Sequence, residues 1–258
     1  MMKLTPDNYY SQEANMAYYS TSQVKSFSEC AARTMAELRG EWQRPPSKAL
    51  LIGSYVDSYF EGTLEQFKLD HPECFKRDGE LKAEYIHADR MIEVAEADPL
   101  FMEYMRGEKQ VIRAGKLFGF PFKIKMDVYH PERIVDLKST ASFAPVYRPG
   151  KGRMSFVEAW GYTLQGGIYQ AIEGESKPFY IAAITKEAVP DKAVIEIGQE
   201  YLDAELMVLK DKLPYYDAIK SGAIEPPRCE HCEYCKLTRV LTHPMTLDEF
   251  ETTYYEEE

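Results

Sequence analysis

Long apolar runs are absent from this chain of 258 residues. No segment approaches the roughly 18 consecutive apolar residues that a membrane-spanning helix requires, which excludes a transmembrane protein. The opening residues 1–7 lack the apolar core of a signal peptide, so we expect a cytoplasmic location. Hydrophobic residues still make up 45% of the chain, enough to bury a sizeable core.

Positive charge is also in short supply, because 31 Lys and Arg face 42 Asp and Glu, a formal net charge of −11. This balance excludes a protein that coats nucleic acid through bulk positive charge. It does not exclude a nuclease, since a local groove can be basic on an acidic body. We expect residues 241–258 to form an acidic, solvated tail.

Cysteine is scarce, and its placement is uneven. The chain has five, of which Cys229, Cys232 and Cys235 fall within seven residues. In a cytoplasmic protein such a cluster favours a metal site over disulfides. We expect the isolated Cys74 to be an ordinary cysteine.

The most informative stretch is a pair of segments, 123–129 and 133–140, that alternate apolar and polar residues. This pattern predicts two half-buried strands, and the turn signal 130–133 between them predicts a hairpin. Residues two apart share a face, so Asp136 and Lys138 lie together and the hairpin brings Asp127 beside them. On the first strand the alternation sets residues 123, 125, 127 and 129 opposite residues 122, 124, 126 and 128. Two adjacent carboxylates repel unless they are neutralised, which a hard divalent cation does well.

The rest of the chain predicts helices and strands around this hairpin. Residues 1–20 are interpreted as a mobile lead-in. A helix capped by Ser20 or Thr21 carries Cys30 and runs toward Gly40. Further helices are expected over 49–62, 155–172 and 200–220, and further strands over 110–113, 116–120, 178–184 and 193–197. The strand–helix–strand order predicts a crossover that places two strands parallel. Because the hairpin strands are antiparallel, we expect a mixed sheet.

Three smaller features surround the hairpin. Gly53 permits close approach of another backbone, and Asp57 lies one turn later on the same helix face. Gln165 and Tyr169, four residues apart, share a helix face. The loop 145–153 is the most basic local segment and could follow a phosphate backbone, although a solvated surface loop explains it equally well.

Together these pieces resemble the PD-(D/E)xK nuclease superfamily, and within it the RecB-like branch and the phage or prophage RecE-type (exonuclease VIII-like) exonucleases. The matching residues are Gly53-x-x-x-Asp57, Asp127, Asp136-Leu137-Lys138 and Gln165-x-x-x-Tyr169. They span residues 50–170 in the order that the branch shows. Asp57 stands where the branch usually has histidine, but it remains an acceptable oxygen ligand for Mg²⁺.

The resemblance implies an α/β fold with a central mixed sheet flanked by helices, as in restriction endonucleases. It also implies metal-dependent hydrolysis of DNA. Asp57, Asp127, Asp136 and the carbonyl of Leu137 would hold Mg²⁺ or Mn²⁺. Lys138 would act on the attacking water or the transition state, and Gln165 and Tyr169 would contact DNA or the surroundings of Lys138.

The resemblance extends to the cysteines and to partners. Some relatives bind a [4Fe–4S] cluster through one cysteine before the nuclease core and three after it, the layout of Cys30 with Cys229, Cys232 and Cys235. Zinc, with His231 in place of one cysteine, and free thiols remain alternatives.

RecE-type enzymes degrade duplex DNA from its ends in the 5′→3′ direction. They leave single strands for a single-strand annealing partner in phage-type recombination, and they form ring-like homo-oligomers.

We therefore expect a single nuclease domain over residues 1–258. Its core covers about 45–200, the N-terminal helix and the Cys-rich segment 226–240 are appendages, and residues 241–258 form the tail. Two alternatives remain open. One is a catalytically inactive DNA-binding or assembly protein with the same fold, and the other is an acidic metal-binding domain of different role.

Overall fold

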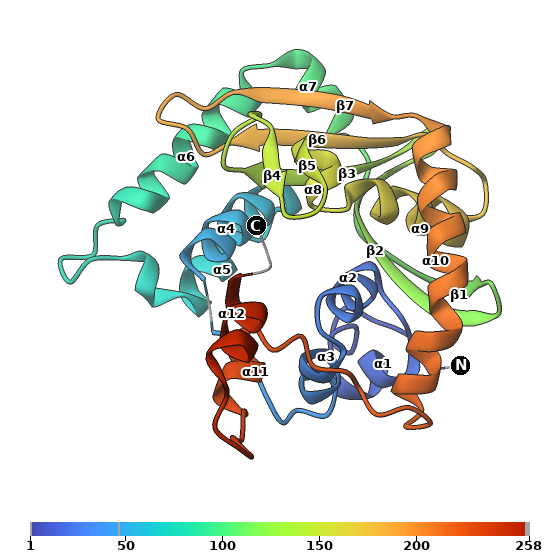
Figure 1. Cartoon of the computed structure of the whole chain (residues 1–258). Coiled ribbons are helices and arrows are strands. Elements are labelled where there is room, and N and C mark those ends of the chain that lie inside the picture. Colours follow the sequence, from blue (N-terminus) through green and yellow to red (C-terminus); the bar gives the residue numbers. More distant parts are fainter. Residues whose placement is uncertain (1, 46, 256–258) are drawn as a thin grey trace.

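Figure 1 shows the computed structural model, which describes residues 2–45 and 47–255. Within these residues one mixed sheet has the strand order β1-β2-β3-β6-β7. Its strands are β1 (Glu108–Leu117), β2 (Phe120–His130), β3 (Arg133–Thr140), β6 (Phe179–Thr185) and β7 (Lys192–Ile197). Neighbours run antiparallel except β3 and β6, which are parallel. The mixed sheet, the β2–β3 hairpin and the crossover between β3 and β6 agree with the sequence prediction.

Helices cover both faces of the sheet, and each face has its own apolar core. One core includes α2 (Thr21–Glu29), α3 (Ala31–Leu38), α8 (Phe156–Ala159), α9 (Tyr162–Glu173) and α10 (Gln199–Lys220). The other core includes α4 (Lys48–Glu61), α6 (Ala83–Glu96) and α7 (Pro99–Tyr104). On β3, Ile134 packs into the first core and Val135 into the second. Burial on both faces explains why this strand is apolar around its functional residues.

Residues 1–20 were predicted to be a mobile lead-in, but residues 2–20 pack against the body of the protein. Helix α1 (Gln12–Ala17) leads to Tyr19, which is 1% exposed. The Tyr19 N–H donates to the carbonyl of Pro121 at 2.8 Å, and the Lys123 N–H donates to the carbonyl of Tyr19 at 2.8 Å. Because β3 pairs with β2 only at residues 128–130, the rest of that β2 edge is open, and this segment pairs with it.

Two predicted helices are each broken in the middle. The helix expected to run from Ser20 toward Gly40 ends at Cys30, whose backbone is extended and whose thiol accepts the Arg33 N–H at 3.5 Å as the cap of α3. The helix expected over 155–172 is split by Gly161, which has a left-handed φ of 61°. Trp160, at the break, is 46% exposed instead of part of the apolar stripe.

The strand predicted over 110–113 lies within β1, which continues without a break to Leu117. The strand predicted over 116–120 is wrong in its middle, because residues 118 and 119 form the turn into β2. The basic stretch expected to be a loop is a two-stranded hairpin of β4 (Val146–Arg148) and β5 (Gly152–Met154).

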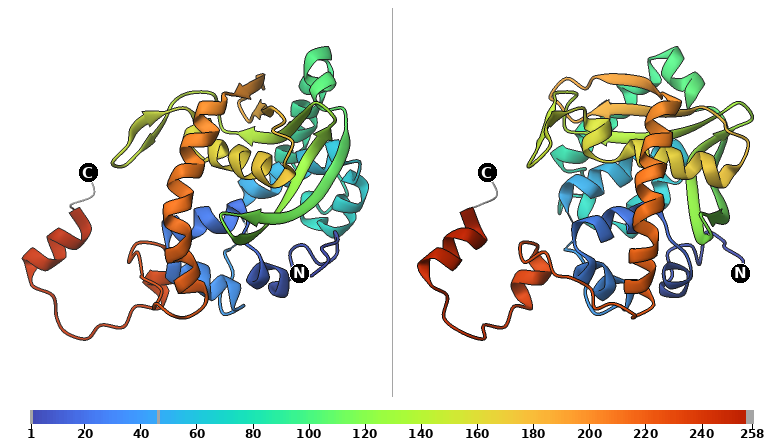
Figure 2. Two further views of the ribbon diagram at one scale, coloured as in Figure 1. Left: turned by 90° about the vertical axis from the view of Figure 1, so that its right-hand side faces the viewer. Right: turned by 45° about the vertical axis from the view of Figure 1, so that its right-hand side comes forward.

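The second core also includes Cys74 of the short 3-10 helix η1 (Pro72–Cys74), and α5 (Leu64–Asp70) packs against it. The C-terminal helices are α11 (Glu233–Leu237) and α12 (Leu247–Tyr255). Figure 2 shows the C-terminal segment leading away from the body, and the part of it from 241 to 252 is mostly exposed. The last three residues of the predicted tail, 256–258, lie outside the described residues. Among the helices described, none is long and apolar enough to cross a membrane.

Candidate active site

The two predicted aspartates lie where β2 and β3 separate. Regular pairing of these strands ends at the pair Val128 and Val135. Asp127 on β2 and Asp136 on β3 are the next residues beyond that pair. Beyond that point Asp127 Oδ2 accepts the Leu137 N–H at 3.0 Å and so takes the place of a ladder bond. In an extended strand the N–H and C=O of one residue point to the same side, so the Leu137 carbonyl faces the same gap.

Asp136 is the most buried of the acidic residues here, at 1% exposure. The Gln165 Nε2 group donates to Asp136 Oδ1 at 2.6 Å, and Lys138 forms an ion pair with Oδ2. Oδ2 is buried and accepts no hydrogen bond from the described residues. Burial raises the pKa of Asp136 to about 7, because Lys138 only partly offsets burial and the charge of Asp127.

Lys138 is a partly buried cation that forms an ion pair with Asp136 and lies near the charge of Asp127. Burial alone would lower the pKa of its ammonium, but the charges of Asp136 and Asp127 raise that pKa above the ordinary value. Its Nζ also lies 5.1 Å from the ring centre of Tyr162. Lys138 is therefore protonated throughout the physiological pH range.

Asp57 reaches the site from α4 on the second face of the sheet. A Cβ at Gly53 would lie 3.0 Å from Ser139 Oγ on β3, so glycine lets this helix lie close to the strand, as the sequence predicted. Asp57 lines a cavity of about 10 Å³ together with Glu61 and Asp127. Burial and the charge of Asp127 raise the pKa of Asp57 well above its usual range. The structure thus brings the third predicted carboxylate to the strand pair.

Gln165 and Tyr169 share the face of α9 that meets the sheet. The Tyr169 hydroxyl donates to the carbonyl of Lys125 at 2.9 Å, so it holds β2, while Gln165 holds Asp136 on β3. Glycines make this approach possible, since a Cβ at Gly166 would lie 2.5 Å from the ring of Phe179. Both residues line a pocket of about 260 Å³ that also contains Asp127, Asp136 and Lys138.

The strand alternation predicted for β2 is wrong at the site itself. Ile124 packs into one core and Val128 into the other, so they do not share a face. Opposite Asp127, Gln110 on β1 has a left-handed φ of 56°, and the β1–β2 register skips this pair. A local distortion of the ladder turns the strand and places Asp127 beside Asp136.

Gln110 is also a functional residue that the sequence did not indicate. Its Nε2 donates to Asp127 Oδ1 at 3.4 Å, so it helps to orient that carboxylate. Tyr9, Tyr10 and Lys25 were missed as well, and all three line the 260 Å³ pocket. A polar residue in a strand and tyrosines in a terminal segment carry no signal that distinguishes them from surface residues.

The donor set suits a hard divalent cation. The oxygen donors are those of Asp57, Asp127, Asp136 and the Leu137 carbonyl, and Mg²⁺ and Mn²⁺ prefer such oxygens. The raised pKa values of Asp57 and Asp136 show that these carboxylates repel one another and lack solvation. They indicate a site where a cation would offset the negative charge that remains after Lys138 pairs with Asp136 Oδ2.

A second cluster joins the two ends of the chain. The sulfurs of Cys30, Cys229, Cys232 and Cys235 all lie within 4.8 Å of one another, without His231. Cys30 Sγ is 3.6 Å from Cys235 Sγ, and Cys229 Sγ is 3.9 Å from it. Burial would raise the pKa of the Cys229 thiol, but backbone N–H groups of residues 232 and 231 lower it to about 6. Such a thiolate is ready to bind a metal.

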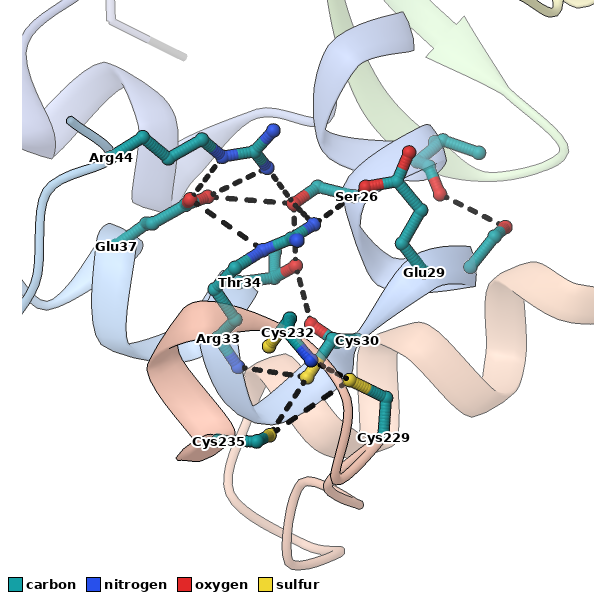
Figure 3. A network of polar contacts seen from close by, with 12 residues as sticks. Ser26, Glu29, Cys30, Arg33, Thr34, Glu37, Arg44, Cys229, Cys232 and Cys235 are labelled. Carbon is teal, nitrogen blue, oxygen red and sulfur yellow. Dashed lines mark hydrogen bonds and ion pairs between the residues drawn. The ribbon is translucent and has the colours of Figure 1, made fainter. Parts of the chain in front are cut away.

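Polar contacts connect this cysteine cluster to α2 (Figure 3). The Thr34 hydroxyl donates to the Cys30 carbonyl at 2.9 Å and to Ser26 Oγ at 2.7 Å. The Arg33 guanidinium forms an ion pair with Glu29 at 2.6 Å. Because Cys30 follows α2 directly, a metal at the cluster would restrain the helix that carries Lys25.

The two-faced mixed sheet, with aspartates on adjacent strands and a lysine two residues after the second, defines the PD-(D/E)xK nuclease superfamily. Comparison with known families agrees with this assignment and identifies one particular family. The chain belongs to the family described as "PDDEXK-like domain of unknown function (DUF3799)", whose model matches residues 20–238.

Among solved structures, the chain is similar to a protein from Eubacterium rectale named "Putative exonuclease". The two are 44% identical over 99% of this chain and 100% of that chain, with a TM-score of 0.94. No protein with a curated description matches the chain.

Proposed function

We propose that this protein is a metal-dependent deoxyribonuclease that hydrolyses the phosphodiester bonds of DNA. The observation that supports it most is the convergence of Asp127, Asp136 and Lys138 in one pocket, with Asp57 in a small cavity that Asp127 also lines. The name of the similar structure from Eubacterium rectale points the same way.

In this proposal the chain supplies ligands, orientation and one fixed positive charge. A bound divalent cation lowers the pKa of water and offsets charge at the phosphate. Asp57, Asp127 and Asp136 would hold that cation, while Gln165 and Gln110 orient the two strand aspartates. Lys138, protonated and partly buried, would place its positive charge near the scissile phosphate or the attacking water.

The test is cleavage of linear duplex DNA in Mg²⁺, read as acid-soluble nucleotides. We expect activity in the wild type and a loss of at least about a hundredfold in Asp136→Asn and Lys138→Ala. Asp211→Asn, an exposed aspartate on α10, is the matched control and keeps full activity. DNA binding without cleavage by the wild type would favour the inactive DNA-binding alternative.

We further propose cleavage from DNA ends, 5′→3′, as the RecE-type resemblance implies. A linear duplex should be degraded and a covalently closed circle of the same sequence spared. Label at a 5′ end should be released before label at a 3′ end. A single-strand annealing partner, phage-type recombination and a ring-like homo-oligomer belong to the same proposal, and light scattering coupled to size-exclusion chromatography tests the ring.

For the cysteine cluster we propose a resident metal that joins both ends of a single domain. The sulfur separations of 3.6 and 3.9 Å favour one tetrahedral ion such as Zn²⁺, since zinc–sulfur bonds of about 2.3 Å set sulfurs about 3.8 Å apart. A [4Fe–4S] cluster, which the resemblance implies, holds its thiolates farther apart because four irons stand between them. Metal analysis with an anaerobic absorption spectrum decides: colourless protein with one zinc, or brown protein with iron.

A further inference from the structure

A groove beside the catalytic pocket lies between α2, α10, the β4–β5 hairpin and the break between α8 and α9. Its volume is about 430 Å³, which is enough for a nucleotide. Lys25 lines both this groove and the catalytic pocket. The Lys25 side chain passes over Gly161, where an added Cβ would lie 3.1 Å from Lys25 Cε. The groove therefore adjoins the catalytic pocket along this lysine.

Among the described residues, the cationic side chains of the groove form no ion pairs, whereas each of its carboxylates has a hydrogen-bond or ion-pair partner. Its cations, Lys25, Arg148, Lys151 and Lys212, form no ion pair with any side chain that the structure describes. The three carboxylates that line it all have partners. Glu29 pairs with Arg33, Glu158 caps α8 through Ser155, and Glu205 accepts from the Thr163 hydroxyl at 3.3 Å. The groove therefore suits a polyanion despite the acidic chain.

An exposed aromatic ring forms part of the groove wall. Trp160 is 46% exposed although it is large and apolar. The Arg148 guanidinium lies 4.2 Å from its ring centre and also donates to the Ala159 carbonyl at 2.8 Å, so the indole is braced. Exposed aromatic rings beside cations are the usual platform for nucleobases in proteins that bind single strands.

We propose that this groove binds the single strand of DNA that leads away from the scissile phosphate, with one base stacked on Trp160. Lys25 then contacts the phosphate between the two pockets, and Arg148 and Lys151 contact the next. This inference rests on the proposed nuclease function and adds a substrate subsite to it. It accounts for an exposed tryptophan at a helix break that the apolar pattern of the sequence does not explain.

Trp160 can be observed directly, because the chain has only two tryptophans. In the variant Trp42→Phe with Asp136→Asn, Trp160 is the one remaining tryptophan, so excitation at a wavelength that tyrosine does not absorb reports on Trp160 alone, and DNA is not cut. We expect an oligothymidylate to quench this emission, because a stacked base quenches indole fluorescence. An abasic oligonucleotide of equal length should bind with little quenching. Trp160→Ala in the Asp136→Asn background should weaken oligothymidylate binding at least about fivefold, measured by anisotropy.

The control variant is Tyr201→Ala, which removes an aromatic ring of α10 that is 53% exposed and does not line the groove. Its affinity for the oligonucleotide should match the parent. Equal quenching by the abasic strand, or unchanged affinity in Trp160→Ala, would overturn the subsite while leaving the nuclease proposal intact. If the parent binds no DNA and the wild type cuts none, both proposals fail.

Discussion

At the scale of single residues, the site depends on charges that the fold keeps away from water. Asp136 is nearly inaccessible, and its two oxygens are held by Gln165 and Lys138. The burial of this carboxylate costs free energy that the rest of the fold must offset. This free-energy cost depends on pH, because it applies only to the ionised carboxylate.

Asp136 should make the metal-free protein less stable as pH rises. The unfolded chain loses this proton near about pH 4, whereas the folded protein keeps it until about pH 7. Between these values the folded state binds more protons, so the free energy of unfolding falls with increasing pH. We expect Asp136→Asn to gain stability relative to wild type from pH 4 to 7, with no further gain above, in urea unfolding without added divalent cation. A pH-independent difference would contradict the assignment.

At the scale of elements, α9 is the support on which the site is built. It contacts β2 through Tyr169 and β3 through Gln165, and its glycines allow it to lie against β6 and α10. Neither contact can be kept if the helix moves outward by even about 1 Å.

Gly166→Ala tests this support. The added Cβ would lie 2.5 Å from the Phe179 ring and 2.8 Å from Leu202, so helix or ring must shift. We expect a loss of about 1–3 kcal/mol in the free energy of unfolding, with lowered nuclease activity. Gly115→Ala is the control, because its Cβ would meet Ile172 at an ordinary 3.4 Å. Equal unfolding midpoints in urea for the two variants would show that α9 tolerates displacement.

The cysteine cluster acts on elements as well, since it attaches α11 to the start of α3. On the proposal that the cluster holds a metal, we expect Cys235→Ser to lose that metal and to unfold at a lower temperature, because one of the four sulfur ligands is removed. Activity should fall too, since α2 carries Lys25 to the catalytic pocket. Cys74→Ser is the control: Cys74 is buried but outside the cluster, so metal content should stay unchanged by elemental analysis.

At the scale of the whole molecule, an acidic chain presents a basic path. The net charge of −11 is spread over the body and the C-terminal segment, while lysines gather in the catalytic pocket and the adjoining groove. Local fields of this kind decide association with DNA more than net charge does.

DNA binding should therefore weaken with salt. The logarithm of the binding constant should fall linearly with the logarithm of salt concentration, because bound phosphates release counterions. We expect Lys151→Gln to reduce the slope by about one. Lys116→Gln, an exposed lysine on β1 outside both pockets, should leave it unchanged. The slopes can be measured by fluorescence anisotropy between about 50 and 200 mM salt. Equal slopes in the two variants would show that the β4–β5 hairpin does not contact the DNA.

Much of the fold was available from the sequence because local patterns determine it. Period-two alternation and a turn signal located the β2–β3 hairpin, and the strand–helix–strand order predicted the parallel pair β3 and β6. The two helices that were predicted to be continuous are broken at Cys30 and Gly161, because a cap and a left-handed residue interrupt a hydrophobic periodicity that continues on either side.

By itself the sequence placed Asp127, Asp136 and Lys138 on two neighbouring strands joined by one short turn. Only the tertiary structure decided the rest of the site. The left-handed Gln110 that reorients Asp127, the N-terminal segment paired with β2, and the meeting of Cys30 with Cys235 depend on contacts between distant segments. Such contacts are stable only once the sheet and both helical layers have formed, so no local pattern encodes them.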